Sequence, residues 1–598
     1  MKSGKNILSA VDIESAKRWT EELYALEKGG SYANFPAAAE YCRKSLAEAG
    51  FENIEIIEHP ADGKSSSFDC TMPPAWDICG RSFLQIAGEN TILADTNNIP
   101  YAAAPWSGAT PPGGVSGELV ALVPGDDVSD VKNKWVLLTI YDGSNPRGEF
   151  LEKLRSNGAV GVAAVDFKGG QDYPDALRWY NGTGRFGWYP VAGEERLPLF
   201  SLSGKTGKML LEKLAKGKVF LHGVMNTKIY SGKIHTITAV IPGKSDTEYA
   251  LFSHIYEPFA ADNSFGFGAA CAIGRAIREK LGTPEKTLRV VFSMELYGFA
   301  AYLADNSRAS LISGALNMDA INHRKQKLLK YFDSPLCNPF FADWVIPEIL
   351  TEALDDIDFI RSGGTLCDDT FSGDPLCGNI PVNWCMNPSG TAHHCGCDDF
   401  EPDWLWAEKE LPAFADAVAN MLQYSSEQIV KLPEIAGAEF LEKSRMICEQ
   451  NISGREKSLL LETLFDYLLG RLKSAEKYCK TKVDKSNLEN LFRKTVEKID
   501  VKDDLSEVAK KASQITVLRL KATPFSFTDI PFAERKSFRV SRLLYALFDG
   551  NRNLYEAIRI SDWICGKRSD DTAIENEIRY LEYLEKYNYV KLKSLQEE

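Results

Sequence analysis

The pattern of apolar and polar positions changes several times along this chain of 598 residues, and each change predicts a different structure. Residues 11–49 repeat apolar side chains at helical spacing, which predicts two helices, and a short strand is expected at 54–58. Between residues 231 and 425, apolar runs alternate with helical segments. The runs lie at 236–241, 249–253, 288–293 and 314–318, and the helices at 266–280 and 299–305. This alternation predicts crossover connections and a mainly parallel sheet flanked by helices.

Residues 74–230 interrupt this α/β pattern with a β-rich texture. Clusters of Gly, Pro and Asp separate short apolar runs at 118–123, 135–140 and 158–165, and helices are expected at 149–156 and 205–216. We therefore expect a discontinuous α/β domain, residues 1–73 and 231–425, with a second domain inserted at 74–230.

The C-terminal third is predicted to be mostly helical. Residues 434–521 are charge-rich with apolar positions at helical spacing, and Pro524 and Pro531 mark a linker. Residues 530–598 then read as helix, turn, helix, helix and a short strand, an order that resembles a winged helix. Acidic and basic residues roughly balance in this tail, so nucleic acid is not the expected partner and packing within the protein is favoured. The block 434–521 is long enough to pack a homo-oligomer.

Composition narrows the class of protein. The length exceeds the roughly 250–300 residues of one core, so several domains are expected. A net charge of −14 with 44% hydrophobic residues describes a globular protein, and no apolar run reaches the roughly 18 residues that span a bilayer. The N-terminus shows no secretory signal, and thirteen irregularly spaced cysteines indicate free thiols. We expect a cytoplasmic protein without a membrane partner.

Candidate metal ligands follow the predicted strands. His254 ends the run 249–253, Asp262 comes eight residues later where a helix begins, and Asp319 follows the run 314–318. A histidine pair, His393 and His394, stands in a turn-like segment. Parallel strands bring their carboxyl ends to one edge of a sheet, and imidazole nitrogens and carboxylate oxygens are zinc ligands. Any one of these residues alone is more simply a structural hydrogen-bonding group, but together they predict a metal site.

Glu295 follows the apolar strand 288–293 almost directly, after Met294. A carboxylate beside a metal site can accept a proton from water and return it to a leaving amine. Taken alone, the same residue reads as a capping glutamate in a solvated turn.

The order of these motifs resembles the M28-type zinc aminopeptidases, and more closely an aminopeptidase-like bacterial branch of unknown function that ends in a winged helix. The matching stretches are His254-Ile-Tyr-Glu-Pro258, Ala261-Asp-Asn263, Met294-Glu-Leu-Tyr-Gly298, Cys367-Asp-Asp-Thr-Phe371 and His393-His-Cys-Gly-Cys-Asp398. Residues 74–230 resemble a protease-associated insert, although a plain β-rich domain fits equally well. The resemblance implies a zinc-exopeptidase-like fold.

The resemblance also implies roles for individual residues. His254 and Asp319 would ligate one metal ion, Asp262 would bridge to a second, and His394 would ligate that second ion. Glu295 would be the general base. Asp369 or Asp398 would orient a ligand or the substrate.

Two positions depart from the family pattern. Those enzymes have a Glu-Glu pair whose second member binds the second metal, and here Leu296 follows Glu295. The position of an orienting carboxylate holds Tyr256, which is a poor substitute. Asp262 and His394 are too few protein ligands for a tight second site, so the sequence favours one zinc ion over two.

Three functions compete at this stage. The first is a metal-dependent hydrolase of peptide-like amide bonds, an aminopeptidase acting on a peptide or small amide. The second is a catalytically silent binding or scaffold protein that retains the fold, which Leu296 and Tyr256 favour and Glu295 opposes. The third, a winged-helix regulator, fits the order of elements in the tail but not its charge balance.

Overall fold

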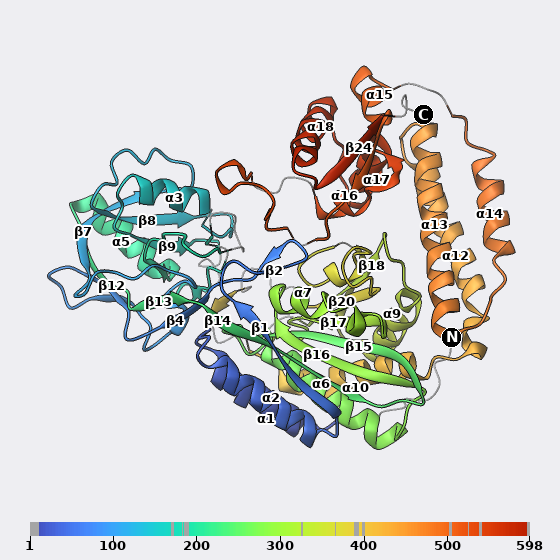
Figure 1. Ribbon diagram of the computed structural model, residues 1–598, viewed down its shortest axis with the longest axis horizontal. Coiled ribbons are helices and arrows are strands. Elements are labelled where there is room, and N and C mark those ends of the chain that lie inside the picture. The colour runs from blue at the N-terminus through green and yellow to red at the C-terminus, as the bar shows by residue number, and fades with distance from the viewer. Residues whose placement is uncertain are drawn as a thin grey trace.

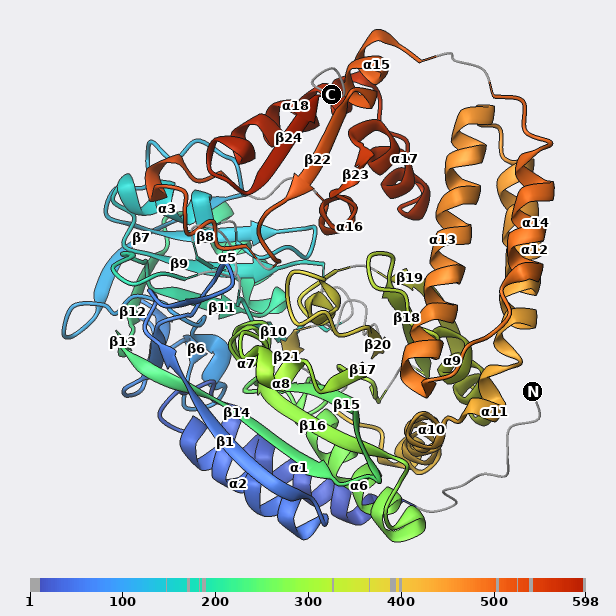
Figure 2. The same ribbon diagram turned by 45° about the vertical axis from the view of Figure 1, so that its right-hand side comes forward.

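A computed structural model of the chain shows four parts: a large α/β unit, a second sheet, a pair of long helices with their neighbours, and a small C-terminal sheet (Figure 1, Figure 2). A large α/β unit lies opposite a small C-terminal sheet, with a second sheet on one side and long helices on the other. The structure describes residues 11–146, 148–168, 173–181, 183–184, 190–324, 327–364, 366–387, 394–396, 401–501, 505–523, 525–536 and 541–594.

An eight-stranded sheet forms the centre of the α/β unit. Its order is β1 (Glu52–Ala61), β14 (Gly232–Ile241), β16 (Lys286–Met294), β15 (Ser245–Ile255), β17 (Ile312–Met318), β20 (Val382–Met386), β18 (Leu328–Pro335) and β19 (Asp358–Gly364). The four central strands, β16, β15, β17 and β20, are parallel to their neighbours within this group, whereas β1 and β14 run antiparallel at one edge. The prediction of an α/β fold with a central parallel core is confirmed.

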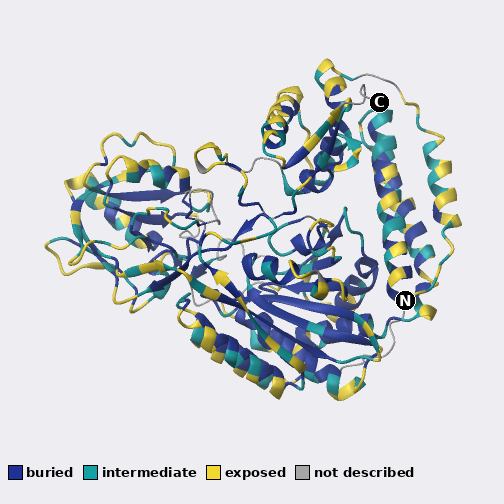
Figure 3. Cartoon of the chain, in the orientation of Figure 1, coloured by how far each residue is buried: buried dark blue, intermediate teal, exposed yellow. Residues whose placement is uncertain are grey.

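Helices cover this sheet, and their apolar faces explain where they pack. The helices are α1 (Ile13–Glu27), α2 (Phe35–Glu48), α6 (Ser264–Leu281), α7 (Tyr297–Leu303), α8 (Asn306–Ala309), α9 (Ala342–Ala353), α10 (Trp404–Gln423) and α11 (Ser426–Ile429). α6 packs on β15, and both α1 and α10 pack on α6. Trp19 and Leu23 of α1 are fully buried there. The central strands are buried on both faces, as continuous apolar runs in parallel sheets should be (Figure 3).

Residues 75–230 contain all the strands of a second, seven-stranded sheet. Its order is β11 (Leu199–Leu202), β9 (Gly161–Asp166), β8 (Lys134–Ile140), β7 (Val115–Leu122), β12 (Phe220–Val224), β5 (Phe83–Ile86) and β6 (Ile92–Asp95). Two helices, α3 (Gly148–Ser156) and α5 (Gly204–Lys216), accompany it. Short two-stranded ladders join β4 (Ala75–Ile78) to β13 (Thr227–Tyr230) and β2 (Ser66–Ser67) to β3 (Cys70–Thr71). The strands and helices predicted in this block are therefore present.

The C-terminal region contains more strand than the sequence suggested. Its helices are α12 (Leu432–Glu449), α13 (Gly454–Cys479), α14 (Ser486–Val496), α15 (Glu507–Ser513), α16 (Arg542–Ala546), α17 (Leu554–Ile564) and α18 (Asp571–Lys586). The helical prediction for 434–521 is wrong at its end, because β22 (Ile515–Arg519) pairs with β23 (Asp549–Asn553) and β24 (Val590–Ser594). Three β-branched residues, Ile515, Thr516 and Val517, open this segment, and such residues are enriched in strands. The winged-helix identity of this region stays a prediction.

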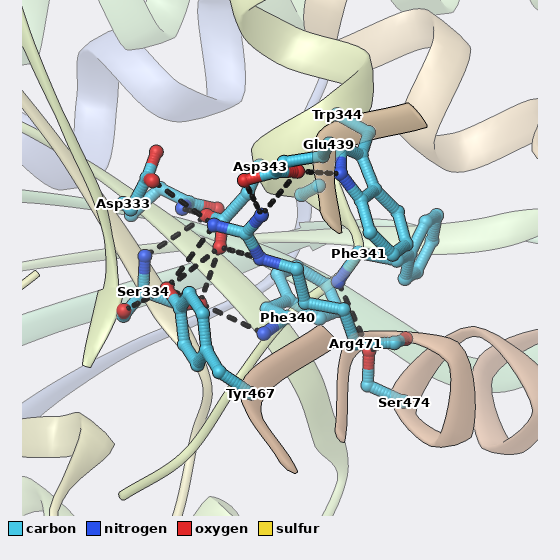
Figure 4. Close-up of polar contacts among 12 residues, drawn as sticks. Asp333, Ser334, Phe340, Phe341, Asp343, Trp344, Glu439, Tyr467, Arg471 and Ser474 are labelled. Carbon is cyan, nitrogen blue, oxygen red and sulfur yellow. Dashed lines mark hydrogen bonds and ion pairs between the residues drawn. The ribbon is translucent and has the colours of Figure 1, made fainter. Parts of the chain in front are cut away.

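A buried ion cluster fastens α13 to the α/β unit (Figure 4). The Arg471 guanidinium of α13 has no exposed surface and contacts Asp343 at 2.7 Å, Asp333 at 2.9 Å and Glu439 at 3.1 Å. Arg361 pairs with Asp333 at 2.6 Å. Lys443 completes the set by pairing with Glu439, also at 2.6 Å, so three carboxylates meet three cations.

The C-terminal region also contacts segments that border the large sheet. Arg519 pairs with the buried Asp374 at 2.6 Å, and Arg542 pairs with Asp368 at the same distance. Among the described residues, no helix is both long enough and apolar enough to span a membrane.

Candidate metal centre

The register of three parallel strands brings the first candidate ligands together. His254 of β15 lies opposite Ser293 of β16, and Phe252 lies opposite Asn317 of β17. Glu295 comes two residues after Ser293, and Asp319 comes two residues after Asn317. The side chains of His254, Glu295 and Asp319 therefore lie at the carboxyl edge of the sheet, where ligands of such folds bind. The sequence prediction of this convergence is confirmed by the strand pairing.

Asn263 fixes the position of Asp262 at the start of α6. Its side chain accepts a hydrogen bond from Gly266 N at 3.3 Å, which caps the helix. The same side chain donates to Ser253 Oγ at 2.9 Å and to the Met318 carbonyl at 2.8 Å, and accepts from Ala320 N. One buried amide thus joins the helix start to the ends of β15 and β17.

His254, Asp262 and Asp319 form a compact set of donors. His254 Nε2 lies 2.9 Å from Asp319 Oδ1 and 3.2 Å from Asp262 Oδ1. A tetrahedral zinc site with bonds of roughly 2.0–2.1 Å separates its ligand atoms by about 3.3 Å. Each carboxylate therefore lies close to the spacing of two zinc ligands from the same imidazole nitrogen, and the groups whose donor atoms all lie within 4.8 Å of one another are His254 with Glu257 and Asp262, and His254 with Asp319 and Asp369.

His394 lies beside the same cluster and faces the other oxygen of Asp262. Its Nε2 is 3.6 Å from Asp262 Oδ2. The inserted block holds it there: β10 (Leu177–Arg178) pairs with β21 (Cys395–Gly396), and Trp179 N donates to the His394 carbonyl at 2.6 Å. The Trp179 ring also contacts the imidazole edge-on, with ring centroids 5.1 Å apart. The neighbouring candidates His393 and Asp398 lie outside the described residues.

Glu257 belongs to this cluster, and the sequence analysis did not select it. Its side chain is buried, with Oε1 4.0 Å from His254 Nδ1 and Oε2 3.8 Å from His394 Nε2. His254, Glu257 and Asp262 all offer donor atoms within 4.8 Å of one another. The available signal was its place three residues after His254 in a stretch already identified as a site.

Burial and like charge shift the protonation of the carboxyl groups. Burial, together with the charges of Asp368, Asp319 and Asp262, raises the pKa of Glu295 to about 8, and His254 only partly opposes this shift. Burial and the neighbouring Asp262 and Glu295 likewise raise the pKa of Glu257 well above its usual range. The cluster therefore resists carrying its full negative charge without an additional cation.

The neighbouring carboxylates also raise the pKa values of His254 and Asp369. Burial lowers the pKa of His254, but Asp262, Asp319 and Glu257 outweigh it and raise that pKa well above the usual value. Burial and the charge of Asp319 raise the pKa of Asp369 well above its usual range.

Asp369 joins the centre, whereas Tyr256 does not support it as expected. His254, Asp319 and Asp369 have donor atoms within 4.8 Å of one another, and Asn317 Nδ2 donates to Asp369 Oδ1 at 3.1 Å. Tyr256 was considered as the group that orients His254. Its buried hydroxyl has no hydrogen-bond partner among the described residues, and its ring stacks on Phe35 at 3.9 Å.

Unusual backbone conformations accompany the donors. Tyr256, Leu296, Ala320 and His394 have positive φ angles of 77°, 62°, 45° and 56°. Three of them directly adjoin Glu257, Glu295 and Asp319. Residues with side chains rarely adopt this region, and such strain concentrates at functional sites. Leu296 itself is fully buried and offers no donor atom.

The donor set suits a divalent ion. His254 Nδ1 and Glu257 Oε2 are buried polar atoms without a hydrogen-bond partner among the described residues. Such atoms are costly unless something binds them. Imidazole nitrogens with carboxylate oxygens match zinc better than calcium or magnesium, which prefer oxygen alone.

Comparison with solved structures shows the fold. No family model matches the chain, and no curated protein matches it in sequence. A zinc aminopeptidase from Bacillus subtilis is similar in structure, with 14% identity and a TM-score of 0.50 over 69% of this chain and 96% of that one. The chain has the fold of a zinc aminopeptidase. A Clostridium acetobutylicum protein described as a peptidase is 11% identical, with a TM-score of 0.48 over 97% of this chain and 98% of that one.

Proposed function

We propose that the protein is a metal-dependent hydrolase of peptide-like amide bonds, an aminopeptidase that uses zinc. The observation that carries this proposal is the convergence of His254, Asp262, Asp319 and Glu295 at the carboxyl edge of the sheet. The fold shared with a zinc aminopeptidase supports the same reading. Polar donors with perturbed protonation in a buried cluster are typical of catalytic sites.

In this proposal His254, Asp262 and Asp319 would hold one zinc ion. Asp369 would support them, because its carboxylate lies within 4.8 Å of donor atoms of His254 and Asp319. When bound, zinc supplies Lewis acidity toward a carbonyl oxygen and a water molecule. Glu295 accepts the proton of the attacking water and delivers it to the leaving amine, so that a C–O bond forms as the C–N bond breaks. Burial and the neighbouring carboxylates raise the pKa of Glu295 to about 8, which supports a role as a proton carrier.

We further propose that the block 74–230, which resembles a protease-associated insert, forms part of the wall of the site. Trp179 and the pairing of β10 with β21 support this proposal, because they hold the segment that carries His394. The substrate would then be enclosed between this block and the sheet edge.

Metal analysis and a panel of aminoacyl substrates test the proposed function. We expect purified protein to contain zinc and to release N-terminal residues, and Glu295→Gln to lower kcat by about 10²–10⁴-fold with zinc retained. Glu410→Gln is the matched control, because Glu410 is a buried carboxyl group bonded to Asn322 at 2.6 Å. A protein that neither binds zinc or cobalt nor turns over any substrate would instead support the catalytically silent scaffold.

A further inference from the structure

One short segment carries three donors of the candidate metal centre. His254, Glu257 and Asp262, whose donor atoms all lie within 4.8 Å of one another, stand between the end of β15 and the start of α6. Residues 256–263 belong to neither element, and one isolated bridge, between Phe259 and Asn263, is their share of β pairing. The directions of Glu257 and Asp262 therefore depend on other contacts that hold this segment.

Glu27 contacts the segment at two places. It is the last residue of α1 and has no exposed surface. Tyr256 N donates to Glu27 Oε2 at 2.8 Å, and Ser264 Oγ donates to Glu27 Oε1 at 2.5 Å. Tyr256 directly precedes Glu257, and Ser264 comes two residues after Asp262. One buried carboxylate therefore joins the two ends of the stretch that carries both donors.

The packing of α1 on α6 fixes Glu27 in this place (Figure 1). A Cβ at Gly268 would lie 2.2 Å from Thr20 Oγ1 and 2.6 Å from the Ala16 carbonyl oxygen, so the two helices meet too closely for a side chain there. Thr20 lies about two helical turns before Glu27, and Gly268 lies about one turn after Ser264. The helices therefore run in opposite directions, and the end of α1 meets the start of α6.

The contact at Tyr256 acts on an unusual backbone conformation. The φ angle of Tyr256 is 77°, a region that residues with side chains rarely adopt. A carboxylate is a strong acceptor for a backbone N–H, so the bond from Tyr256 N to Glu27 offsets the strain of this turn. The turn sets the direction in which the chain leaves β15, and with it the placement of Glu257.

We propose that Glu27 is a positioning residue of the metal centre. By holding Tyr256 and Ser264 together, it keeps the donor atoms between them directed toward His254. Each oxygen of Glu27 already accepts a hydrogen bond, so Glu27 acts through the segment and not as a ligand. This inference rests on the proposed function, since it assumes that the cluster binds zinc.

Cobalt(II) binding to the chelator-treated, full-length protein tests this inference without any measurement of activity. The visible absorption of bound cobalt reports its coordination geometry, and a titration gives its dissociation constant. Glu27→Leu removes both acceptors at a similar size, and we expect it to weaken cobalt binding by about 10–100-fold and to change the absorption spectrum. Ser264→Ala removes one of the two contacts and should have a smaller effect of the same kind.

Two further variants separate positioning from a general loss of stability. In Glu27→Gln the amide oxygen can accept from Tyr256 N while the amide nitrogen donates to Ser264 Oγ, so this variant should restore the wild-type affinity and spectrum. Glu456→Leu is the matched control, because it removes a carboxyl group that is 3% exposed and accepts from Arg568 at 2.9 Å in the C-terminal region. It should leave cobalt binding unchanged even where it lowers the free energy of unfolding.

The outcomes separate this inference from the proposed function. A wild-type affinity and spectrum in Glu27→Leu overturn the inference and leave the proposed function standing. Equal losses in Glu27→Leu and Glu27→Gln, or in Glu27→Leu and Glu456→Leu, also overturn it. If Glu27→Leu fails to fold, Ser264→Ala decides, and an unchanged affinity and spectrum in that variant overturn the inference. A wild type that binds neither cobalt nor zinc overturns the proposed function and this inference with it.

Discussion

Two clusters of buried carboxyl groups differ in what faces them: one lies at the carboxyl edge of the large sheet, and the other lies where α12 and α13 meet the α/β unit. Around Arg471, three carboxylates meet three basic side chains, and the cations and Trp344 hold the pKa of Glu439 at about 2 against the opposing effect of burial. Around His254, burial and mutual repulsion raise the pKa of Glu257, Glu295 and Asp369.

This difference separates a structural cluster from a site. Burial acts in the same direction in both places, and it raises the pKa of Asp333 even beside Arg471. The Arg471 cluster is nevertheless complete in itself, because its cations belong to the protein. At the His254 cluster, Glu257 Oε2 and His254 Nδ1 have no hydrogen-bond partner among the described residues, so we infer that its missing charge comes from a bound cation.

The largest effect on the free energy of unfolding is expected from removing Arg471, the central cation of the Arg471 cluster. Arg471→Leu leaves Asp343, Asp333 and Glu439 buried without their shared partner, which should destabilise the protein by about 3–5 kcal/mol. Urea unfolding measures this loss, and zinc content should stay at the wild-type value.

The exposed pair Lys409 and Asp356 provides the control for Arg471→Leu. Lys409→Ala should leave the free energy of unfolding nearly unchanged, because surface pairs contribute little. If Arg471→Leu unfolds no more easily than Lys409→Ala, the Arg471 cluster does not fasten α13 as we describe.

The next largest effect is expected from protonating Glu439, which should lower the free energy of unfolding at acid pH. Its pKa of about 2 lies below the usual 4.5, so its stabilising contribution is present above pH 4.5 and is lost as the pH falls toward 2. The shift corresponds to about 3 kcal/mol. The difference in unfolding free energy between wild type and Glu439→Gln should therefore shrink from pH 6 to pH 3, and a constant difference would contradict a balanced Arg471 cluster.

In the His254 cluster, ionisation of Glu295 should have a smaller effect of opposite sign, lowering the free energy of unfolding as the pH rises. The pKa of Glu295 is about 8 in the metal-free protein, so its contribution to stability is present below pH 4.5 and is lost as the pH rises toward 8. Glu295→Gln should stabilise the metal-free protein by about 1–3 kcal/mol at pH 7, and this gain should disappear near pH 4.5. A loss of stability at pH 7 would show that Glu295 is not crowded by like charge.

Strand patterns predicted much of the site, because a residue that follows a parallel strand must lie at the sheet edge. His254, Glu295 and Asp319 were found in this way. Glu257 was missed because its direction depends on the left-handed turn at Tyr256, which no apolar pattern encodes. The Arg471 cluster was also missed, since helical periodicity does not show that a basic side chain meets buried carboxylates from distant segments. The strand Ile515–Arg519 was missed because it directly follows a charge-rich helical segment and ends in a charged residue instead of continuing the apolar run.

Zinc-dependent unfolding of the chelator-treated protein tests most directly whether the His254 cluster, and not the Arg471 cluster, requires a bound cation. Zinc at about one hundred times its Kd should raise the free energy of unfolding by about 2.7 kcal/mol in the wild type and by a similar amount in Arg471→Leu. The increase should be absent in His254→Ala. An equal increase in His254→Ala, or no increase in the wild type with zinc or cobalt, would contradict the account.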